Sequence, residues 1–373
     1  MKLAIKITAL FALAFLFPSF GFAQYTRTDL VTNLGTGGTV EDPHLVNAWG
    51  LVSTATSPFW VSDNATGLST LYTINNTSTG IKATVNGLVV SVTSATGGAG
   101  MPTGIVAPET PTGGTDFTVT AVNPNTHLQA SAPAAFIFAA LDGTITGWNP
   151  TVNPTVAILT PANRSSAGAT YTGLAIATIN GHKFLYAADD GANRRIDVFD
   201  SNFQLVTYFG PDAFVDPRIP RKFAPYGIQT ATAKDGTQTV WVTYTALDKA
   251  QGGFVSAFTP EGQLMRHIDL DGPLHSPWGV AIAPPDFGPL SNALLITNNT
   301  PTGRINAFDP KTGAFLGALR DTAGKAIEID NVWAIQFGQS GPAGSNGNTN
   351  QLFFTAGNNN YGSGTFGVIT VGQ

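Results

Sequence analysis

Side chains that carry oxygen atoms stand beside short apolar segments in this chain. Glu41 and Asn47 precede the segment AWGLV, Asn64 ends the segment FWVSDN, and Asn299 ends the segment ALLITNN. Carboxylate and amide oxygens are the ligands that Ca²⁺ takes in proteins, and a bound cation would polarise an ester or lactone carbonyl. Asp and Asn also close turns at the ends of strands. Two explanations therefore remain open, a calcium site and ordinary turns.

Four aromatic residues occupy equivalent places in the sequence. Trp49, Tyr226 and Trp278 each stand directly before a glycine, and Trp333 stands before an alanine in the similar segment NVWAIQF. Such rings stack on sugars or aromatic ligands, and they also fill space in a protein core. The two other copies of this segment have Thr103 and Thr172 at this position, so none of the six copies has a carboxylate there, which weighs against a metal site.

Two histidines share a local sequence. His44 lies in EDPHLVNAWG and His275 lies in DGPLHSPWG. As a pair they could transfer protons or bind a metal. The alternative is that each ring forms a hydrogen bond with the backbone of a neighbouring blade.

Basic residues are concentrated in one region. Arg194, Arg195 and Arg221 lie close together in the sequence, in a protein whose net charge is −5. Arginine binds carboxylates and phosphates through its planar fork of donors, so we predict an anion-recognition patch. Several Asp residues lie in the same stretch, and a network of ion pairs is the alternative.

The segments that must position these residues form a repeat. Each copy of the repeat begins with a short apolar segment that contains a glycine. These glycines are Gly50, Gly104, Gly173, Gly227 and Gly279, and Ala334 takes the corresponding place in the last copy. A second apolar segment follows and often ends in Asp or Asn, and a third leads into a turn such as DPKTG. Alternation with period two and separators of Gly, Pro, Asn and Asp predict short β-strands.

A repeat of about 55 residues built from such sheets is typical of a β-propeller. We predict an all-β fold, a six-bladed β-propeller of four-stranded antiparallel blades, in which residues 24–373 form a single domain. Residues 25–34, YTRTDLVTNL, have no sheet of their own. We expect them to supply the outer strand of the last blade and to close the ring, which would remove an exposed edge.

In such a propeller the first strands begin, and the second strands end, at the same end of the central channel. We call this end the mouth. The oxygen-bearing, aromatic, histidine and arginine candidates are all expected to lie around it.

Residues 1–23 have the pattern of a secretory signal peptide. Lys2 and Lys6 precede an apolar run and the small residues of GFA, so cleavage is expected before Gln24. A membrane anchor is the alternative, but the apolar run is shorter than the ~20 residues that a span needs. We expect a secreted or periplasmic bacterial protein, with no membrane span in the mature chain. The sequence contains no Cys, which excludes disulfides and thiolate sites.

Composition limits the partners. Only 11% of the residues are charged, 43% are hydrophobic, and the net charge is negative. A general nucleic-acid binder is therefore not expected.

The segments NAWGLV, FIFAALDGTITGWNP, SPWGVAIAP and FFTAGNNNYGSGTFGVI resemble an uncharacterised family of exported bacterial proteins related to NHL-type six-bladed propellers. The resemblance covers nearly all of the chain after the signal peptide. It implies the scaffold and no established activity.

We predict a protein that binds an unknown small-molecule or protein ligand at the mouth, without demonstrable catalysis. No cofactor is certain from the sequence, and Ca²⁺ is the candidate. The alternative is a calcium-dependent lactonase or esterase-type hydrolase that uses Glu41, Asn47, Asn64 and Asn299. A structural matrix protein is a third hypothesis. Oxygens converging on one point would favour the hydrolase, and Trp rings filling the axis would favour the binding protein.

Overall fold

The computed structural model describes residues 25–164, 167–207, 209–248, 252–268, 272–341 and 345–372. The predicted signal peptide lies outside these residues. Strands dominate the described chain, and short 3₁₀ turns are found at η1 (Thr36–Gly38), η2 (Pro161–Arg164) and η3 (Gly288–Leu290). Within these ranges, no helix is long and apolar enough to cross a membrane.

The first two repeats share one sheet. The first repeat consists of β3 (Ala48–Val52), β4 (Phe59–Asp63), β5 (Leu68–Thr77) and β6 (Gly80–Val85), and the second of β8 (Pro102–Val106), β11 (Phe136–Ala140), β12 (Ile145–Trp148) and β13 (Val156–Leu159). The short strand β7 (Val90–Val92) pairs with β5 and, in parallel, with β13. The first two repeats are thus hydrogen-bonded to each other, which the sequence pattern did not predict.

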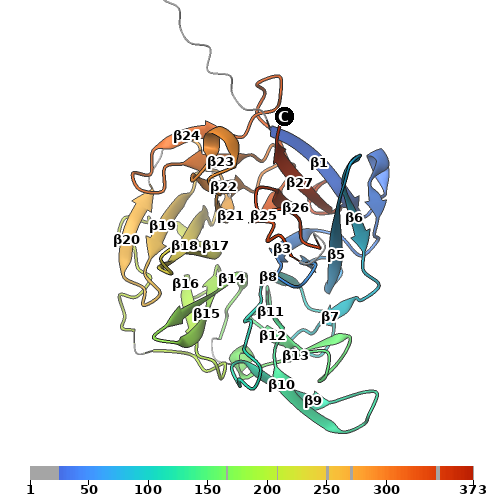
Figure 1. The fold of residues 1–373 in the computed structure, drawn as a ribbon. Helices are drawn as coiled ribbons and strands as arrows, with labels where there is room; N and C mark the ends of the chain where they lie inside the picture. The colour runs from blue at the N-terminus through green and yellow to red at the C-terminus, as the bar shows by residue number, and fades with distance from the viewer. Residues whose placement is uncertain are drawn as a thin grey trace, which may run out of the picture.

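A hairpin is inserted into the second repeat. Strands β9 (Thr118–Val122) and β10 (Gln129–Pro133) form a separate two-stranded sheet. It projects away from the other sheets (Figure 1).

The third repeat has fewer strands than we predicted. It consists of β14 (Tyr171–Ile179), β15 (His182–Asp189) and β16 (Arg195–Phe199). After β16 the chain makes only an isolated bridge between Phe199 and Leu205. The following segment contains Pro211, Pro217 and Pro220, and proline cannot donate a ladder hydrogen bond.

The fourth and fifth repeats each form a four-stranded antiparallel sheet. The strands are β17 (Phe223–Thr232), β18 (Gln238–Ala246), β19 (Phe254–Phe258), β20 (Leu264–Ile268), β21 (Pro277–Ile282), β22 (Leu294–Asn298), β23 (Ile305–Phe308) and β24 (Phe315–Ala318).

The last sheet contains both ends of the described chain. Its order is β2-β1-β27-β26-β25, and its strands are β25 (Val332–Phe337), β26 (Leu352–Ala356), β27 (Thr365–Val371), β1 (Tyr25–Thr32) and β2 (Val40–Glu41). Strand β1 runs antiparallel to β27, from Tyr25 opposite Val371 to Thr32 opposite Thr365. The Tyr25 hydroxyl also donates to the carbonyl of Phe287 in the preceding repeat at 2.9 Å.

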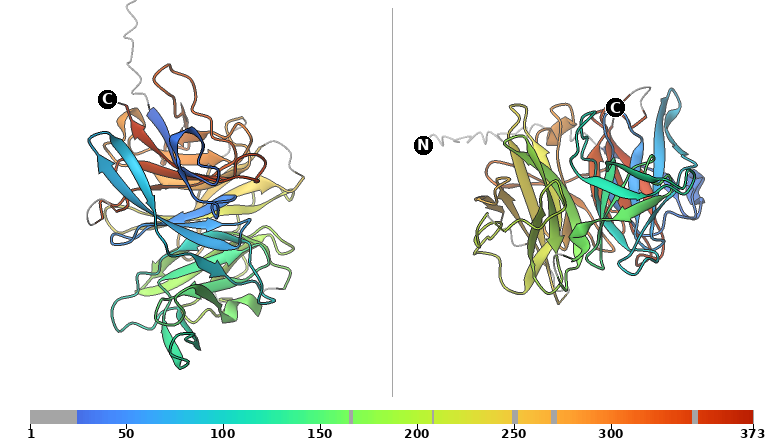
Figure 2. Two further views of the ribbon diagram at one scale, coloured as in Figure 1. Left: turned by 90° about the vertical axis from the view of Figure 1, so that its right-hand side faces the viewer. Right: turned by 90° about the horizontal axis from the view of Figure 1, so that it is seen from below.

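The first strands of the repeats lie around a common centre, and the sheets extend outward from it (Figure 1). Figure 2 shows the molecule from two further sides, with the hairpin of β9 and β10 at the bottom of the left view. Each contacts the first strand of the next repeat, in the order β3, β8, β14, β17, β21, β25, and β25 in turn contacts β3. The fold is all-β and has the character of a propeller, as the sequence predicts.

The repeated glycine explains how the first strands come so close. A Cβ atom at Gly50 would lie 2.2 Å from the carbonyl oxygen of Thr103, and one at Gly227 would lie 2.1 Å from that of Trp278. Each glycine therefore faces the backbone of the next first strand. The core lies between successive sheets, where side chains such as Ile137 of the second repeat and Leu185 and Phe199 of the third are buried together.

Candidate functional site

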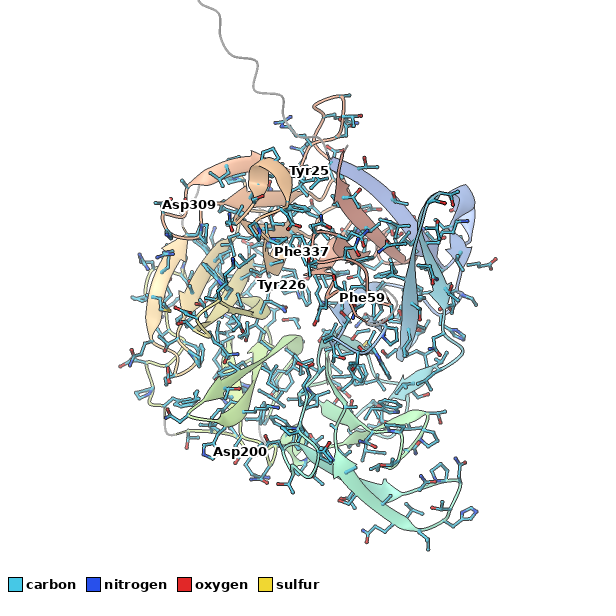
Figure 3. All side chains as sticks on the ribbon, viewed as in Figure 1. Tyr25, Phe59, Asp200, Tyr226, Asp309 and Phe337 are labelled. Atoms are coloured by element: carbon cyan, nitrogen blue, oxygen red, sulfur yellow. The ribbon has the colours of Figure 1, made fainter. Side chains whose placement is uncertain are left out.

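The four aromatic candidates meet at the centre of the molecule. The rings of Trp49 and Trp333 stack with centroids 3.7 Å apart, and Trp278 and Tyr226 each lie 5.9 Å from Trp333. The three Trp side chains are buried and Tyr226 is half-buried. Figure 3 shows Tyr226 near the centre of the arrangement. The four residues lie together, as the repeat predicts, with their rings packed on one another.

Hydrogen bonds hold two of these indoles. The Trp278 Nε1 donates to the carbonyl of Thr172, and the Trp333 Nε1 donates to Asn47 Oδ1, each at 2.9 Å. The Trp49 Nε1 has no hydrogen-bond partner among the described residues. Burial, with smaller contributions from nearby Tyr361 and Asp190, raises the pKa of Tyr226 well above its ordinary value, so its hydroxyl stays protonated.

The asparagines of the calcium hypothesis have hydrogen-bond partners within the protein, and Glu41 lies apart from them. Asn47 Nδ2 donates to Asn64 Oδ1 at 3.0 Å, and Asn299 Oδ1 accepts a bond from the Tyr361 hydroxyl at 2.8 Å. Glu41 is exposed on β2, the strand at the outer edge of the last sheet. Over the described ranges, no group of three or more His, Asp or Glu side chains is arranged to hold a metal. The geometry brings Asn47 and Asn64 together and leaves Glu41 apart.

Each histidine candidate bonds within its own loop. His44 Nδ1 lies 3.1 Å from Asp42 Oδ1, and His275 Nε2 lies 2.9 Å from the carbonyl oxygen of Gly272. Neither contact reaches the backbone of a neighbouring blade, which was the structural alternative, and no contact among the described residues joins the two rings as a pair.

Asp189, at the end of β15, closes a turn. Asp189 Oδ1 accepts bonds from the backbone amides of Thr170 and Gly191 at 2.9 and 2.8 Å. The adjacent Asp190 differs, because its buried Oδ1 has no hydrogen-bond partner among the described residues. Burial, with the neighbouring charge of Asp189, raises the pKa of Asp190 to about 6, although Arg194 opposes the shift.

The three arginine candidates line one pocket of about 750 Å³. The pocket is formed by β16, the loop from β16 to β17, and parts of β17 and β18. Its apolar wall consists of Ile196, Val198, Phe209, Phe214, Ile219 and Phe223. A volume of this size suits a small organic ligand.

The arginines are placed by the strand ends around the pocket. Arg194 is exposed in a left-handed turn (φ 51°) after β15, and its Nη1 lies 3.5 Å from the carbonyl oxygen of Arg221. Arg195 begins β16 and its Nε donates to Asp197 Oδ1 at 2.6 Å. Arg221 is exposed just before β17, and its guanidinium has no hydrogen bond or ion pair with the described residues. Arg195 thus fits the ion-pair alternative, whereas Arg221 is an exposed cation at the pocket.

Two acidic residues also line the pocket, and their charges are satisfied locally. Asp197 Oδ2 accepts a bond from the Tyr171 hydroxyl at 2.8 Å. Asp216 Oδ2 accepts from the Ser256 hydroxyl at 2.7 Å and lies 2.5 Å from His267 Nδ1. Burial alone would raise the pKa of Asp216, but hydrogen bonds from Ser256, the Arg218 backbone and His267 outweigh it and leave the pKa below its ordinary value. Asp216 is therefore an anion at neutral pH.

Tyr244 lines the same pocket, and the sequence analysis did not single it out. Its side chain is buried, and its hydroxyl has no hydrogen-bond partner among the described residues. Burial raises the pKa of Tyr244 above its ordinary value, the nearby Ser256 hydroxyl lowers it in part, and Asp216 adds to the rise. Tyr244 sits in the alternating pattern VWVTYTA, where its type alone gives no hint of a pocket.

A second pocket, of about 500 Å³, lies at the other end of the first strands. Residues of β3, β8, β14, β17, β21 and β25 line it, among them Val52, Val106, Ile176, Gln229, Ile282 and Gln336. Its wall is mainly uncharged. The axis is thus filled by aromatic rings toward the mouth and hollowed at the opposite end.

Three proteins of Acanthamoeba polyphaga mimivirus are similar to this chain in sequence. "Uncharacterized protein R640" is 33% identical over 215 residues, which cover 55% of this chain and 38% of that protein. "Uncharacterized protein L690" is 29% identical, and the match covers 78% of this chain and 73% of that protein. "Uncharacterized protein R648" is 28% identical, and the match covers 88% of this chain and 75% of that protein. The chain thus spans well under half of the first relative's length.

Solved structures with a similar fold are β-propellers, and no protein-family model matches the sequence. The chain covers 100% of a streptogramin B lyase structure with 95% of its own residues, at 10% identity and a TM-score of 0.51. The WD40 β-propeller domain of Doa1 is 9% identical, with a TM-score of 0.44, 87% of this chain covered and 93% of that domain. At these identities the likeness concerns the fold alone, and the cycle of contacts among the first strands gives the chain its propeller character.

Proposed function

We propose that the chain is a six-bladed propeller, closed by its N-terminal strand, that binds an organic anion in the pocket beside β16. The cycle of contacts among the first strands supports the blade number. The pairing of β1 with β27 supports the closure. Export of the mature chain is part of the proposal and rests on the sequence of residues 1–23.

The observation that carries the binding proposal is the joint lining of one pocket by arginines and apolar side chains. Arg194, Arg195 and Arg221 outnumber Asp197 and Asp216. Both of those carboxylates already accept hydrogen bonds from the protein, whereas the Arg221 guanidinium is open to solvent. The pocket therefore attracts a negative group.

The apolar wall indicates the chemical character of the rest of the ligand. The side chains of Phe209, Phe214 and Phe223 would cover a hydrocarbon or aromatic body, and burial of apolar area drives such binding. A small inorganic anion would leave this wall uncovered. The site therefore suits a carboxylate or sulfonate that carries an apolar group.

Fluorescence titration with anilinonaphthalene sulfonate at low ionic strength tests the proposal. The probe joins an anionic group to an aromatic body, and its emission rises on burial. We expect saturable binding to the folded protein, weakened about tenfold in Arg221→Gln through loss of a charged contact worth about 1.4 kcal/mol. Added salt should weaken binding as well.

Lys234→Gln is the matched control. Lys234 is exposed in the turn between β17 and β18, outside the pocket lining. The substitution removes one positive charge from the sheet that contains β17 and should leave the affinity for anilinonaphthalene sulfonate unchanged. Equal affinity of the wild type and Arg221→Gln would contradict the proposed site.

A further inference from the structure

We infer that the protein has a second anion site, on the fifth repeat, that binds the dianion of an organic phosphate monoester. The site is a pocket of about 490 Å³ between the sheet of β22, β23 and β24 and the loop before β21. These three strands lie side by side (Figure 1). The pocket shares no lining residue with the pocket of the proposed function.

Two arginines stand opposite each other on this sheet. Strands β23 and β24 are antiparallel, and the Leu319 amide donates to the Ile305 carbonyl at 3.0 Å. The same register places Arg304 opposite Arg320, and both residues line the pocket. Directly opposed side chains in an antiparallel pair have Cβ atoms about 4.5–5.5 Å apart, and like charges at such positions destabilise the sheet. A bound anion would offset this repulsion.

The side of the sheet that carries the arginines also forms the pocket wall. Residues two apart on a strand point to the same side, so Arg304 shares its side with Asn306, and Arg320 shares its side with Ala318. All four residues line the pocket. Phe308 follows on the same side of β23 and is buried against residues of the fourth repeat. The pocket therefore adjoins the packed contact between the fourth and fifth repeats.

The charges at the pocket are unbalanced. Arg304 Nη2 forms an ion pair with Glu328 Oε1 at 2.7 Å, and Glu328 does not line the pocket. Arg320 Nη1 donates to the Gly324 carbonyl at 2.8 Å, and Arg320 forms no ion pair with the described residues. His275 also lines the pocket, and none of the described lining residues has a carboxylate. The positive charge of Arg320 is therefore available to a ligand.

Buried asparagines hold the polar wall in place. Asn298 and Asn306 are 7% and 4% exposed, and the Nδ2 of each donates to the carbonyl of Pro273, at 2.8 and 2.7 Å. Asn298 Oδ1 accepts a hydrogen bond from the His275 amide at 3.2 Å. These bonds fix the loop that carries His275 against the sheet. A ligand therefore meets a preformed wall and does not have to order the loop.

These features indicate the class of the anion. A phosphate monoester has three acceptor oxygens and a charge close to −2 at neutral pH, and guanidinium groups bind such oxygens through charge-assisted hydrogen bonds. One dianion can therefore bind both arginines. Thr300 and Thr302 also line the pocket, and their hydroxyls can donate or accept hydrogen bonds. The volume exceeds that of a phosphate group, and the polar wall suits a hydroxylated body such as glycerol.

Calorimetric titration at pH 8 with glycerol 1-phosphate, inorganic phosphate and dimethyl phosphate tests the inference. At this pH the monoester is a dianion, since its second pKa is about 6, whereas dimethyl phosphate carries one charge. We expect saturable binding of glycerol 1-phosphate, tighter than that of inorganic phosphate because the glycerol contacts the polar wall. Dimethyl phosphate should bind about tenfold more weakly, through loss of a charged contact.

Each comparison can contradict one part of the inference. Equal affinity for glycerol 1-phosphate and inorganic phosphate would overturn the assignment of an organic phosphate. Equal affinity for glycerol 1-phosphate and dimethyl phosphate would overturn the assignment of a dianion.

Variants locate the site. Arg320→Gln should weaken the binding of glycerol 1-phosphate about tenfold. Lys311→Gln is the matched control and should leave the affinity unchanged, because Lys311 is exposed in the turn between β23 and β24 and does not line the pocket. Ala318→Asp keeps both arginines and adds a carboxylate opposite Asn306, so it should abolish binding. It tests the site even if Arg320→Gln does not fold, and unchanged affinity in either folded variant would overturn the inference.

The two pockets are distinguished by their arginines. Arg221→Gln should leave the affinity for glycerol 1-phosphate unchanged. Weaker binding in Arg221→Gln, with Arg320→Gln unaffected, would assign the phosphate to the pocket beside β16 and overturn the inference. Because the pockets share no residue, the proposed function can fail without affecting this site.

Discussion

The indole nitrogen of Trp333 in the last repeat donates a 2.9 Å hydrogen bond to the side-chain oxygen of Asn47 at the start of the first. The same asparagine donates through Nδ2 to Asn64 Oδ1. Asn47 itself has positive φ (50°), a conformation that Asn adopts more readily than most residues. The Asn47 side chain therefore connects the first repeat to the last repeat beside the packed rings of Trp49 and Trp333.

Replacement of Asn47 should destabilise the protein. Asn47→Ala leaves the buried Trp333 Nε1 without its acceptor, at a cost of about 1–3 kcal/mol, and places alanine at positive φ. Asn47→Gly removes the same bonds but tolerates the backbone. Urea unfolding of both variants separates the two effects. Stability equal to the wild type in Asn47→Gly would show that the bonds contribute nothing.

Gly227→Ala should be among the more damaging small substitutions. Its Cβ would lie 2.1 Å from the backbone oxygen of Trp278, so the first strands of two repeats must separate, at about 1–3 kcal/mol or more. Gly87→Ala is the control, because a Cβ there meets nothing within 4 Å. Thermal unfolding should show a lower midpoint for Gly227→Ala alone. Equal midpoints would contradict the packing role of the repeated glycine.

Tyr244→Phe should keep or raise the stability of the ligand-free protein. The substitution removes a buried hydroxyl that has no partner in the described chain. Tyr186→Phe removes a hydroxyl that donates to Pro260 and should cost about 1 kcal/mol. Urea unfolding measures both. A loss at Tyr244 as large as that at Tyr186 would mean that the Tyr244 hydroxyl is already satisfied by the protein.

The charge of Asp190 should make stability depend on pH. Burial raises the folded pKa from 3.8 to about 6, so the folded state binds the proton more tightly than the unfolded state. Stability should fall as the pH rises from about 4 to about 6, and the loss should persist above that range. Asp190→Asn removes the charge and therefore this loss of stability. The variant should match the wild type at pH 4 and exceed its melting temperature at pH 8.

Asp309→Asn should change the pH dependence of stability in the opposite direction from Asp190→Asn. Backbone amides of Thr312 and Lys311 bind the Asp309 carboxylate and lower its pKa, so its charge stabilises the folded state above the unfolded pKa and the contribution is lost in acid. The variant should be less stable than the wild type at pH 8 and similar at low pH. A pH-independent difference for Asp190→Asn would contradict the shift at that residue.

The sequence predicts the parts of this fold that repeat. Gly50 and Gly227 mark the first strands because each must lie against the next strand's backbone. Trp49 and Trp333 follow the same spacing, so their meeting could be anticipated from period alone. The repeat therefore predicts the all-β class and the grouping of the aromatic residues.

Features that break the repeat could not be predicted in the same way. The pairing of β7 with β13 depends on two short segments that carry no shared motif. The pocket wall comes largely from the chain after Phe199, where a fourth strand was expected, and Phe209 and Phe214 belong to it. Tyr244 has the alternation of an ordinary strand residue. Its unsatisfied hydroxyl is a property of three-dimensional packing.

A crystal of the protein soaked in para-iodobenzoate, with the iodine located by its anomalous scattering, tests the central claim most directly. The account predicts iodine beside Phe209, Phe214 and Phe223, with the carboxylate facing Arg194 and Arg221. Iodine bound only in the axial pocket beside Gln229 and Gln336, or no bound iodine at a concentration that saturates binding in solution, would contradict it.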